Sequence, residues 1–259
     1  YSGTTGLSIA FLNGRPPKEI YKDSPFEVGF TVKNTGAFDV TEGALCFGAM
    51  SEEVFSKPDT CTSLGSLKGR RTNIGGESKE FIESGYKFRL DYKQDTNYKI
   101  TGKVCYLYKM ELPFDVCLKS LETNAENQCD IGVVKLKPTS QGGPVQIVSI
   151  TEDIIPSENQ NEMMLTIVLK NTDGGQIYNP QSISSASCPA ENNINLQNRA
   201  MVSVKLPGEY GEARCVPDNT AVFSSSGMAK IICKGIYYSK DKSYPLQASL
   251  TLLFGYIKK

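Results

Sequence analysis

A repeated stretch of sequence constrains this chain more than any other feature. Residues 28–36 (VGFTVKNTG) recur in related form at residues 165–172 (LTIVLKNT). Both copies alternate apolar with small or polar residues, the pattern of a half-buried β-strand; the apolar positions are Val28, Phe30 and Val32, and Leu165, Ile167 and Leu169. Each copy then runs into Asn-Thr and glycine, where Asn and Gly accommodate the positive φ of a turn. A repeat longer than about a hundred residues indicates two domains of one fold, because solenoid repeats span only about 20–50 residues.

The segment 138–144 (PTSQGGP) is the natural boundary between the two copies. It has a proline at each end and two glycines inside, a composition that interrupts a strand. We therefore predict a first domain at residues 1–137, a linker at 138–144 and a second domain at 145–259. Each domain is long enough to bury a core.

The fold class follows from the short spacing of the predicted strands. No segment of ten or more residues keeps a helical period, and strands recur about every 10–15 residues with turn residues between them. We predict an all-β chain of two tandem immunoglobulin-like antiparallel β-sandwich domains. Besides the repeated strands, the predicted strands are residues 7–11, 43–50, 79–92 with a break near Gly85, 98–108, 112–118, 131–136, 145–155, 200–206, a hairpin at 214–233, and 244–256. The polar stretches 51–77 and 180–198 are predicted surface loops.

The eight cysteines favour disulfides and an oxidising compartment. They are Cys46, Cys61, Cys105, Cys117, Cys129, Cys188, Cys215 and Cys233. Two pairs close short loops, Cys117–Cys129 and Cys215–Cys233, whereas the pairing of the other four stays open. Each predicted domain holds an odd number of cysteines, so either one bridge crosses between the domains, with Cys188 as a candidate, or two thiols stay free.

Composition excludes several classes of function. Lys plus Arg equals Asp plus Glu, so no net field favours nucleic acid. No apolar run reaches the roughly 20 residues of a membrane span. The first residues lack the basic start and apolar core of a signal peptide, so we expect a mature or trimmed product. The chain has no histidine, which excludes mixed Cys/His zinc sites and histidine-based nucleophilic catalysis.

The remaining chemical motifs each have an ordinary structural interpretation. Ser84-Gly-Tyr-Lys87 matches the Ser-x-x-Lys spacing of a serine–lysine dyad but lies at the predicted start of a strand. The acidic pairs 52–53 and 152–153 are interpreted as solvated charge. Residues 171–175 (NTDGG) offer oxygens to calcium but lack spaced carboxylates, so a plain turn is favoured. The tyrosines suit either a recognition surface or, as we favour, the half-exposed faces of strands. We predict no cofactor and no metal.

The segments 26–36 and 164–175 carry a family resemblance. Their strand, which follows a proline corner and ends in Lys-Asn-Thr and glycine, resembles the immunoglobulin-like modules of archaeal and bacterial cell-surface proteins. Examples are the cell-adhesion-related CARDB type and the repeats of archaeal surface-layer proteins. The resemblance covers about a third of each half. It implies an extracellular, non-catalytic module.

Three functions are compatible with this sequence. The first is a structural subunit of an extracellular surface-layer-like, pilus-like or filament assembly, whose partners are copies of itself or other cell-surface proteins. The residues Leu7, Ile9 and Phe11 are a candidate donated or edge strand for such contacts, although pairing within their own domain is favoured. The alternative is a monomeric adhesion or ligand-binding module that uses the loops 51–77 and 180–198. An enzyme is the third and needs a carboxylate pair in a cleft.

Overall fold

The computed structural model confirms that the chain is built from antiparallel β-sheets. It describes residues 3–48, 53–91, 94–120, 126–136, 141–156, 160–190, 193–206, 208–238 and 242–259. Within these ranges there is no α-helix. The same ranges contain three short 3₁₀ helices, which are η2 (Pro180–Ser182), η3 (Ile194–Leu196) and η4 (Gly208–Tyr210).

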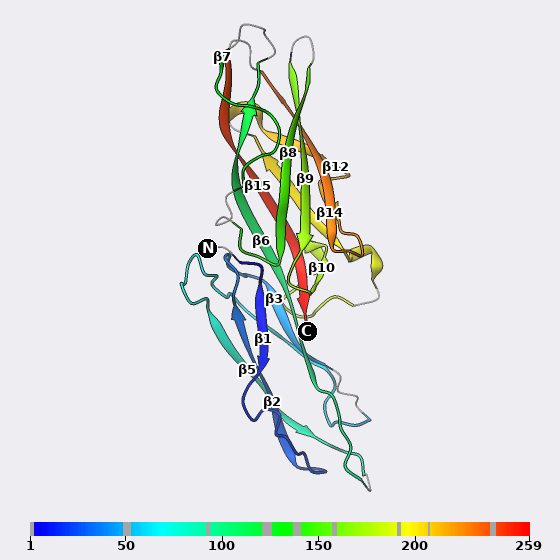
Figure 1. The fold of residues 1–259 in the computed structure, drawn as a ribbon. Helices are drawn as coiled ribbons and strands as arrows, with labels where there is room; N and C mark the ends of the chain where they lie inside the picture. Colours follow the sequence, from blue (N-terminus) through cyan, green and yellow to red (C-terminus); the bar gives the residue numbers. More distant parts are fainter. Residues whose placement is uncertain are drawn as a thin grey trace.

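Two bodies are joined end to end in an elongated molecule (Figure 1). The first body pairs a three-stranded sheet in the order β1-β2-β5 with strands β4, β3 and the beginning of β6. Phe30 of β2 and Phe47 of β3 meet across the two layers with ring centroids 5.3 Å apart. The bounds are β1 (Leu7–Phe11), β2 (Pro25–Asn34), β3 (Gly43–Gly48), β4 (Thr60–Ser63), β5 (Ser78–Lys87) and β6 (Thr101–Leu118).

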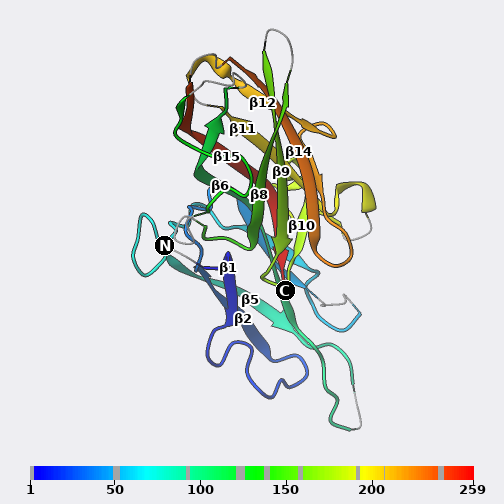
Figure 2. The same cartoon turned by 45° about the horizontal axis from the view of Figure 1, so that its top comes forward.

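The second body is a sheet that folds back over itself. Its strands run in the order β6-β15-β11-β12-β14-β9-β8. As a result β8, β9 and β14 lie over β6, β15 and β11 in both views (Figures 1 and 2). The bounds are β7 (Glu126–Asn127), β8 (Val145–Pro156), β9 (Asn161–Asn171), β10 (Gln176–Tyr178), β11 (Arg199–Lys205), β12 (Glu212–Val216), β13 (Thr220–Val222), β14 (Met228–Tyr237) and β15 (Lys242–Lys258).

One strand, β6, belongs to both bodies. It is 18 residues long, about 60 Å at the usual rise of a strand. Its first residues pair with β3, and residues 104–118 pair with residues 244–258 of β15. A single twelve-stranded sheet therefore contains strands from both sides of the predicted linker. Of that linker, residues 138–140 lie outside the described residues, and Gln141 is buried.

The sequence prediction of two strands, 98–108 and 112–118, is wrong because β6 continues through residues 109–111, and it also passes Pro113 without a break. Alternate residues of an antiparallel strand direct their N–H groups to opposite sides. The N–H groups of Leu107 and Cys117 both bond away from β15, to Glu42 and Glu152. Pro113 is also odd-numbered, so its backbone nitrogen points away from β15. Its missing N–H therefore removes no hydrogen bond of the β6–β15 ladder. Two other predictions also fail. Residues 131–136 form only an isolated bridge at Val133, and the 51–77 stretch contains strand β4.

Four buried aromatic rings fill the place where the bodies meet. Tyr106 and Tyr108 come from β6, and Phe254 and Tyr256 come from β15. All four are fully buried, and neighbouring centroids are 5.8–6.2 Å apart. The interpretation of the tyrosines as half-exposed is therefore wrong for Tyr106, Tyr108 and Tyr256. Burial is tolerated because each hydroxyl finds backbone partners.

The hydroxyl groups of these tyrosines bond four distant segments of the chain. Tyr106 accepts from the N–H of Leu7 (3.0 Å). Tyr108 donates to Gly142 O (2.6 Å) and accepts from Phe38 N–H (3.2 Å). Tyr256 accepts from the N–H of Gly175 (2.8 Å). The junction thus ties the first strand, both repeated turns and the connection between the halves to the β6–β15 ladder.

The repeated Asn-Thr turns have the same local chemistry in both bodies. The side-chain amide of Asn34 donates to Phe38 O, and that of Asn171 donates to Gly175 O, in each case four residues ahead. A Cβ atom on Gly36 would collide with the Tyr108 hydroxyl, just as one on Gly175 would collide with Tyr256. The two copies therefore share Asn and Gly because the glycine of each turn must approach a buried tyrosine closely.

We predict that Tyr108→Phe lowers the free energy of unfolding by about 1–3 kcal/mol, because it leaves the Phe38 N–H without its partner and removes one of the two hydrogen bonds that the Gly142 carbonyl accepts. Urea denaturation measures the change. The control is Tyr238→Phe, which removes an exposed hydroxyl and is expected to cost less than about 0.5 kcal/mol. Equal effects of the two substitutions would contradict the role given to Tyr108.

Candidate functional site: disulfides, strand edges and a buried carboxylate

All eight cysteines form disulfides. Cys117 bonds to Cys129 and Cys215 bonds to Cys233, the two pairings that short loops favour. Cys46 bonds to Cys61, and like Cys215 and Cys233 these residues lie directly opposite each other on neighbouring strands. The fourth bridge, Cys105–Cys188, joins β6 to the stretch that follows η2. It is the bridge between the two halves of the sequence that the odd cysteine counts suggested.

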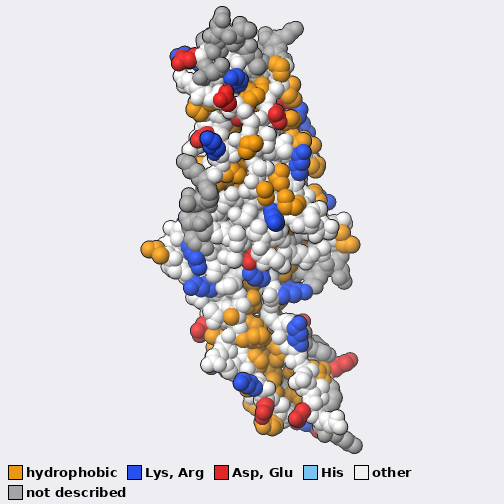
Figure 3. All heavy atoms as spheres, viewed as in Figure 1, with side chains coloured by type: hydrophobic (Ala, Val, Ile, Leu, Met, Phe, Trp, Pro, Cys, Tyr) orange, Lys and Arg blue, Asp and Glu red, His pale blue; other side chains and the backbone are white. Residues whose placement is uncertain are grey.

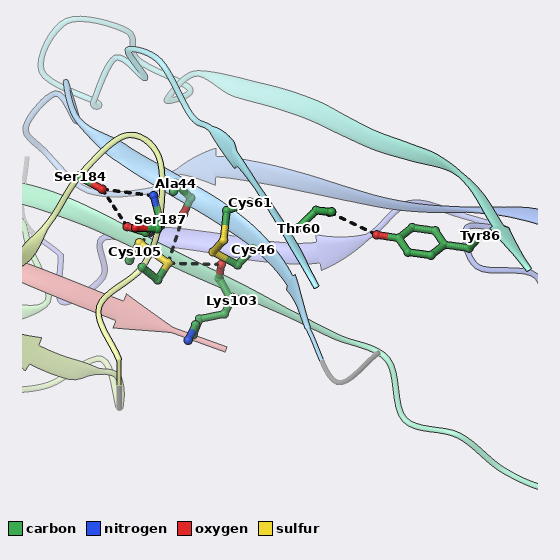
Figure 4. The surroundings of a disulfide bond; sticks show 10 residues. Ala44, Cys46, Thr60, Cys61, Tyr86, Lys103, Cys105, Ser184 and Ser187 are labelled. Atoms are coloured by element: carbon green, nitrogen blue, oxygen red, sulfur yellow. Dashed lines mark hydrogen bonds between the residues drawn. A yellow bond between two sulfur atoms is a disulfide. The ribbon is translucent and has the colours of Figure 1, made fainter. Parts of the chain in front are cut away.

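The two predicted recognition loops are partly fastened to the molecule. The 180–190 segment packs at the junction, where Ile183 is 7% exposed and lies against Gly255. Cys188 Sγ of this segment lies 3.8 Å from the carbonyl oxygen of Ala44 in β3, and Figure 4 shows the hydrogen bonds between Ser184 and Ser187. In the 53–77 segment, Asp39 accepts hydrogen bonds from Gly69 N–H (2.7 Å) and Thr72 Oγ1 (2.6 Å). Residues 51, 52, 191 and 192 of these loops lie outside the described residues.

The candidate edge strand pairs within its own body. Strand β1 runs antiparallel to β2 with Leu7 opposite Asn34 and Phe11 opposite Phe30. Gly6 accepts from Thr35 and Leu12 donates to Gly29, so the even-numbered residues face β2.

The odd-numbered residues Leu7, Ile9 and Phe11 direct their backbone groups away from β2. The Leu7 N–H bonds to Tyr106, and in the described part of the chain β2 is the one strand that pairs with β1. The backbone groups of Ile9 and Phe11 consequently form an open edge.

The second body has a seam where the edges of β6 and β8 face each other, and several groups close it. The side chain of Gln141 bonds both the N–H (2.7 Å) and the carbonyl (3.0 Å) of Ile147 in β8. Further along β8, Val134 N–H donates to Ile150 O and Glu152 N–H donates to Gly132 O. The segment around residues 132–134 therefore covers the β8 edge, and the Cys117–Cys129 disulfide holds its start to β6.

A buried carboxylate, that of Glu152, lies within this closure. It projects from β8 into the body, is 2% exposed, and accepts the Cys117 N–H on both carboxylate oxygens (3.2 and 2.9 Å). Burial raises its pKa to about 7, with a smaller contribution from Asp153, whereas the bond from Cys117 opposes the shift. The sequence interpretation of this acidic pair as solvated charge is therefore wrong for Glu152. The pattern of residues around β8 gave no signal of it.

The other sequence candidates are engaged in structural contacts. Asn171 bonds to Gly175 and Tyr256, and Asp173 accepts from Gly6 N–H (3.3 Å) and Lys258 Nζ (2.7 Å), so these oxygens serve the junction. Ser84 lies in β5 and donates to Glu27. Glu52 is not among the described residues. Across the ranges that the structure describes, no group of His, Cys, Asp or Glu side chains forms a metal site, and no helix is long and apolar enough to cross a membrane.

Comparison of the sequence with models of protein families gives no match, and comparison with curated proteins gives no significant match.

We predict that Glu152→Gln stabilises the protein at pH 8 by up to about 3 kcal/mol and has little effect near pH 4.5. The carboxyl is protonated more readily in the folded chain, whose pKa is about 7, than in the unfolded chain, whose value is near 4.5. Its contribution to stability is thus fully present below pH 4.5 and is lost as pH rises through 7. Glutamine keeps the neutral state at every pH.

Urea denaturation at both pH values tests this prediction. Asp153→Asn, which removes the exposed neighbour of Glu152 in the sequence, is the control and should change stability by less than about 0.5 kcal/mol at either pH. A Glu152→Gln effect that is the same at pH 4.5 and pH 8 would show that ionisation of this carboxyl does not oppose folding.

Proposed function

We propose that the protein is a non-enzymatic structural subunit of an extracellular cell-surface assembly, of filament, pilus or surface-layer type. The observation that carries this proposal is the continuous β6–β15 ladder, which runs through the buried junction from one body into the other. A chain of separate domains on a flexible linker adapts its shape to ligands, whereas a shared strand holds two bodies in one orientation. A fixed orientation is what a repeating assembly requires of its subunit.

The four disulfides support an extracellular site of action. Disulfides persist in oxidising compartments and are rare in reducing ones. Here they fasten β3 to β4, β6 to the 180–190 segment, β6 to the seam, and β12 to β14. We further propose that each body is an immunoglobulin-like sandwich, as the sequence resemblance implies, with β6 shared between them.

The open edge of β1 supplies a contact between copies. An edge strand with free backbone groups accepts another strand by β-augmentation. Phe11, at the end of this edge, is 48% exposed. Figure 3 shows further hydrophobic side chains on the visible face of both bodies, between charged side chains of both signs. Such a face suits contacts with a partner of mixed surface chemistry rather than a strongly charged polymer.

The alternative, a monomeric adhesion or ligand-binding module acting through the loops 51–77 and 180–198, has less support. Both loops are fastened by disulfides or buried contacts, and the second packs against the junction. Loops held in this way contribute more to the body of the protein than to an adaptable recognition surface.

Substitution at Ile9 tests the proposed contact. Ile9→Pro removes an outward N–H but none of the N–H groups that face β2, and proline is tolerated on edge strands. Ile9→Ala is the matched control, because it also truncates the partly buried side chain yet keeps the N–H. We expect the native chain and Ile9→Ala to form polymers, seen by light scattering and electron microscopy without reductant, and Ile9→Pro to remain monomeric.

Two results would contradict different parts of the proposal. A native chain that stays monomeric over the full concentration range would contradict the structural-subunit function. Polymers that persist in Ile9→Pro would leave that function standing and exclude the β1 edge as the contact.

A further inference from the structure

A broad groove lies at the end of the first body that is remote from the junction. One wall comes from residues 11–22, at and after the end of β1, and the other from the ranges 88–91 and 94–100, before β6. Its volume is about 1190 Å³, above the roughly 300–1,000 Å³ typical of small-molecule pockets. Of the two loops considered for recognition, 51–77 contributes Phe55 to this groove and 180–198 contributes no lining residue. Its size suits a ligand made of several linked units.

The floor of the groove is a fixed cluster of aromatic rings. Phe55, Phe88 and Tyr98 contact one another edge to face, with centroids 5.3–6.0 Å apart. Phe55 is 1% exposed, and its ring packs edge to face against Phe26 of the core. Tyr98 is 40% exposed, so this cluster presents an anchored ring to solvent.

Exposed aromatic rings also occur on the opposite wall. Tyr21 is 69% exposed and Phe11 is 48% exposed, and both line the groove together with Tyr98. The Tyr21 hydroxyl donates to Glu19 (3.1 Å), which holds the side chain in place. The wall itself is supported by backbone bonding, since Asp23 N–H donates to Phe88 O (2.9 Å). Rings exposed on two supported walls form platforms for a ligand with flat apolar faces.

The charges of the described residues that line the groove balance. These residues include three cations, Lys18, Lys22 and Lys99, and three anions, Glu19, Asp91 and Asp95. One pair, Lys22 and Asp91, already forms an ion pair at 2.9 Å. A phosphorylated or strongly acidic ligand would need an excess of cations, and a basic ligand would need an excess of anions. The electrostatics favour a neutral ligand.

The uncharged polar side chains that line the groove can form hydrogen bonds with hydroxyl groups of a ligand. The amide side chains of Asn13, Gln94 and Asn97 line the groove, and an amide both donates and accepts hydrogen bonds. Most of the lining comes from segments outside the β-ladders, so an extended peptide would find no continuous row of backbone groups to pair with. We propose that this groove is a binding site for a neutral oligosaccharide, whose sugar rings stack on Tyr21 and Tyr98 while the amides bond its hydroxyls.

The test is ligand-observed NMR with neutral oligosaccharides of glucose, mannose, galactose and N-acetylglucosamine, three to six units long, at millimolar concentration. We expect at least one series to bind, with affinity increasing with length, and Tyr21→Ala and Tyr98→Ala each to weaken binding at least tenfold. Tyr98→Phe should retain binding, because the ring is kept. Tyr238→Ala, which removes an exposed tyrosine of the second body, is the matched control and should bind like the native chain.

Three results would overturn the proposal. They are the absence of binding by every series, binding that Tyr21→Ala and Tyr98→Ala leave unchanged, and capture of neutral peptides in place of the sugars. Circular dichroism of each variant separates loss of the groove from loss of the fold. The assay reads binding by the dissolved chain, so its result is independent of whether copies of the chain assemble.

Discussion

The pairing of β6 with β15 is the interaction on which the rest of this structure depends. Residues 104–118 and 244–258 form one uninterrupted antiparallel ladder, although both strands contain a proline. At the middle of the molecule the two strands contribute the buried rings of Tyr106, Tyr108, Phe254 and Tyr256. The hydroxyl groups of the three tyrosines bond backbone groups of segments from the first strand to the second repeated turn. Packing and hydrogen bonding therefore converge on the same place.

This arrangement explains why the molecule resembles one rod more than two connected domains. The first body cannot rotate against the second without breaking backbone bonds of β6 or exposing the aromatic cluster, and both changes are costly. The Cys105–Cys188 bridge and the ion pair of Lys258 with Asp173 add contacts across the same region. A fixed rod leaves its ends and edges for contacts. The open β1 edge serves the proposed assembly, and the aromatic groove serves the proposed sugar site.

The sequence predicted the features that local pattern controls. Alternation located β2 and β9, and the short loops between cysteines gave Cys117–Cys129 and Cys215–Cys233. It missed features that depend on distant partners. The continuity of β6 through residues 109–111 depends on their pairing with residues 251–253 of β15, which lie far away in the sequence. The burial of Glu152 depends on Cys117 of another strand, and the groove depends on two loops far apart in the chain.

The most direct test of the account is whether the two bodies keep one orientation in solution. Residual dipolar couplings of backbone amides report the orientation of each body against a common alignment frame. If the β6–β15 junction is rigid, couplings from β2 and β5 in the first body and from β9 and β14 in the second fit a single alignment tensor, with the bodies oriented as in Figure 1. Two tensors of different magnitude, one for each body, would show independent motion and would contradict a rigid β6–β15 junction.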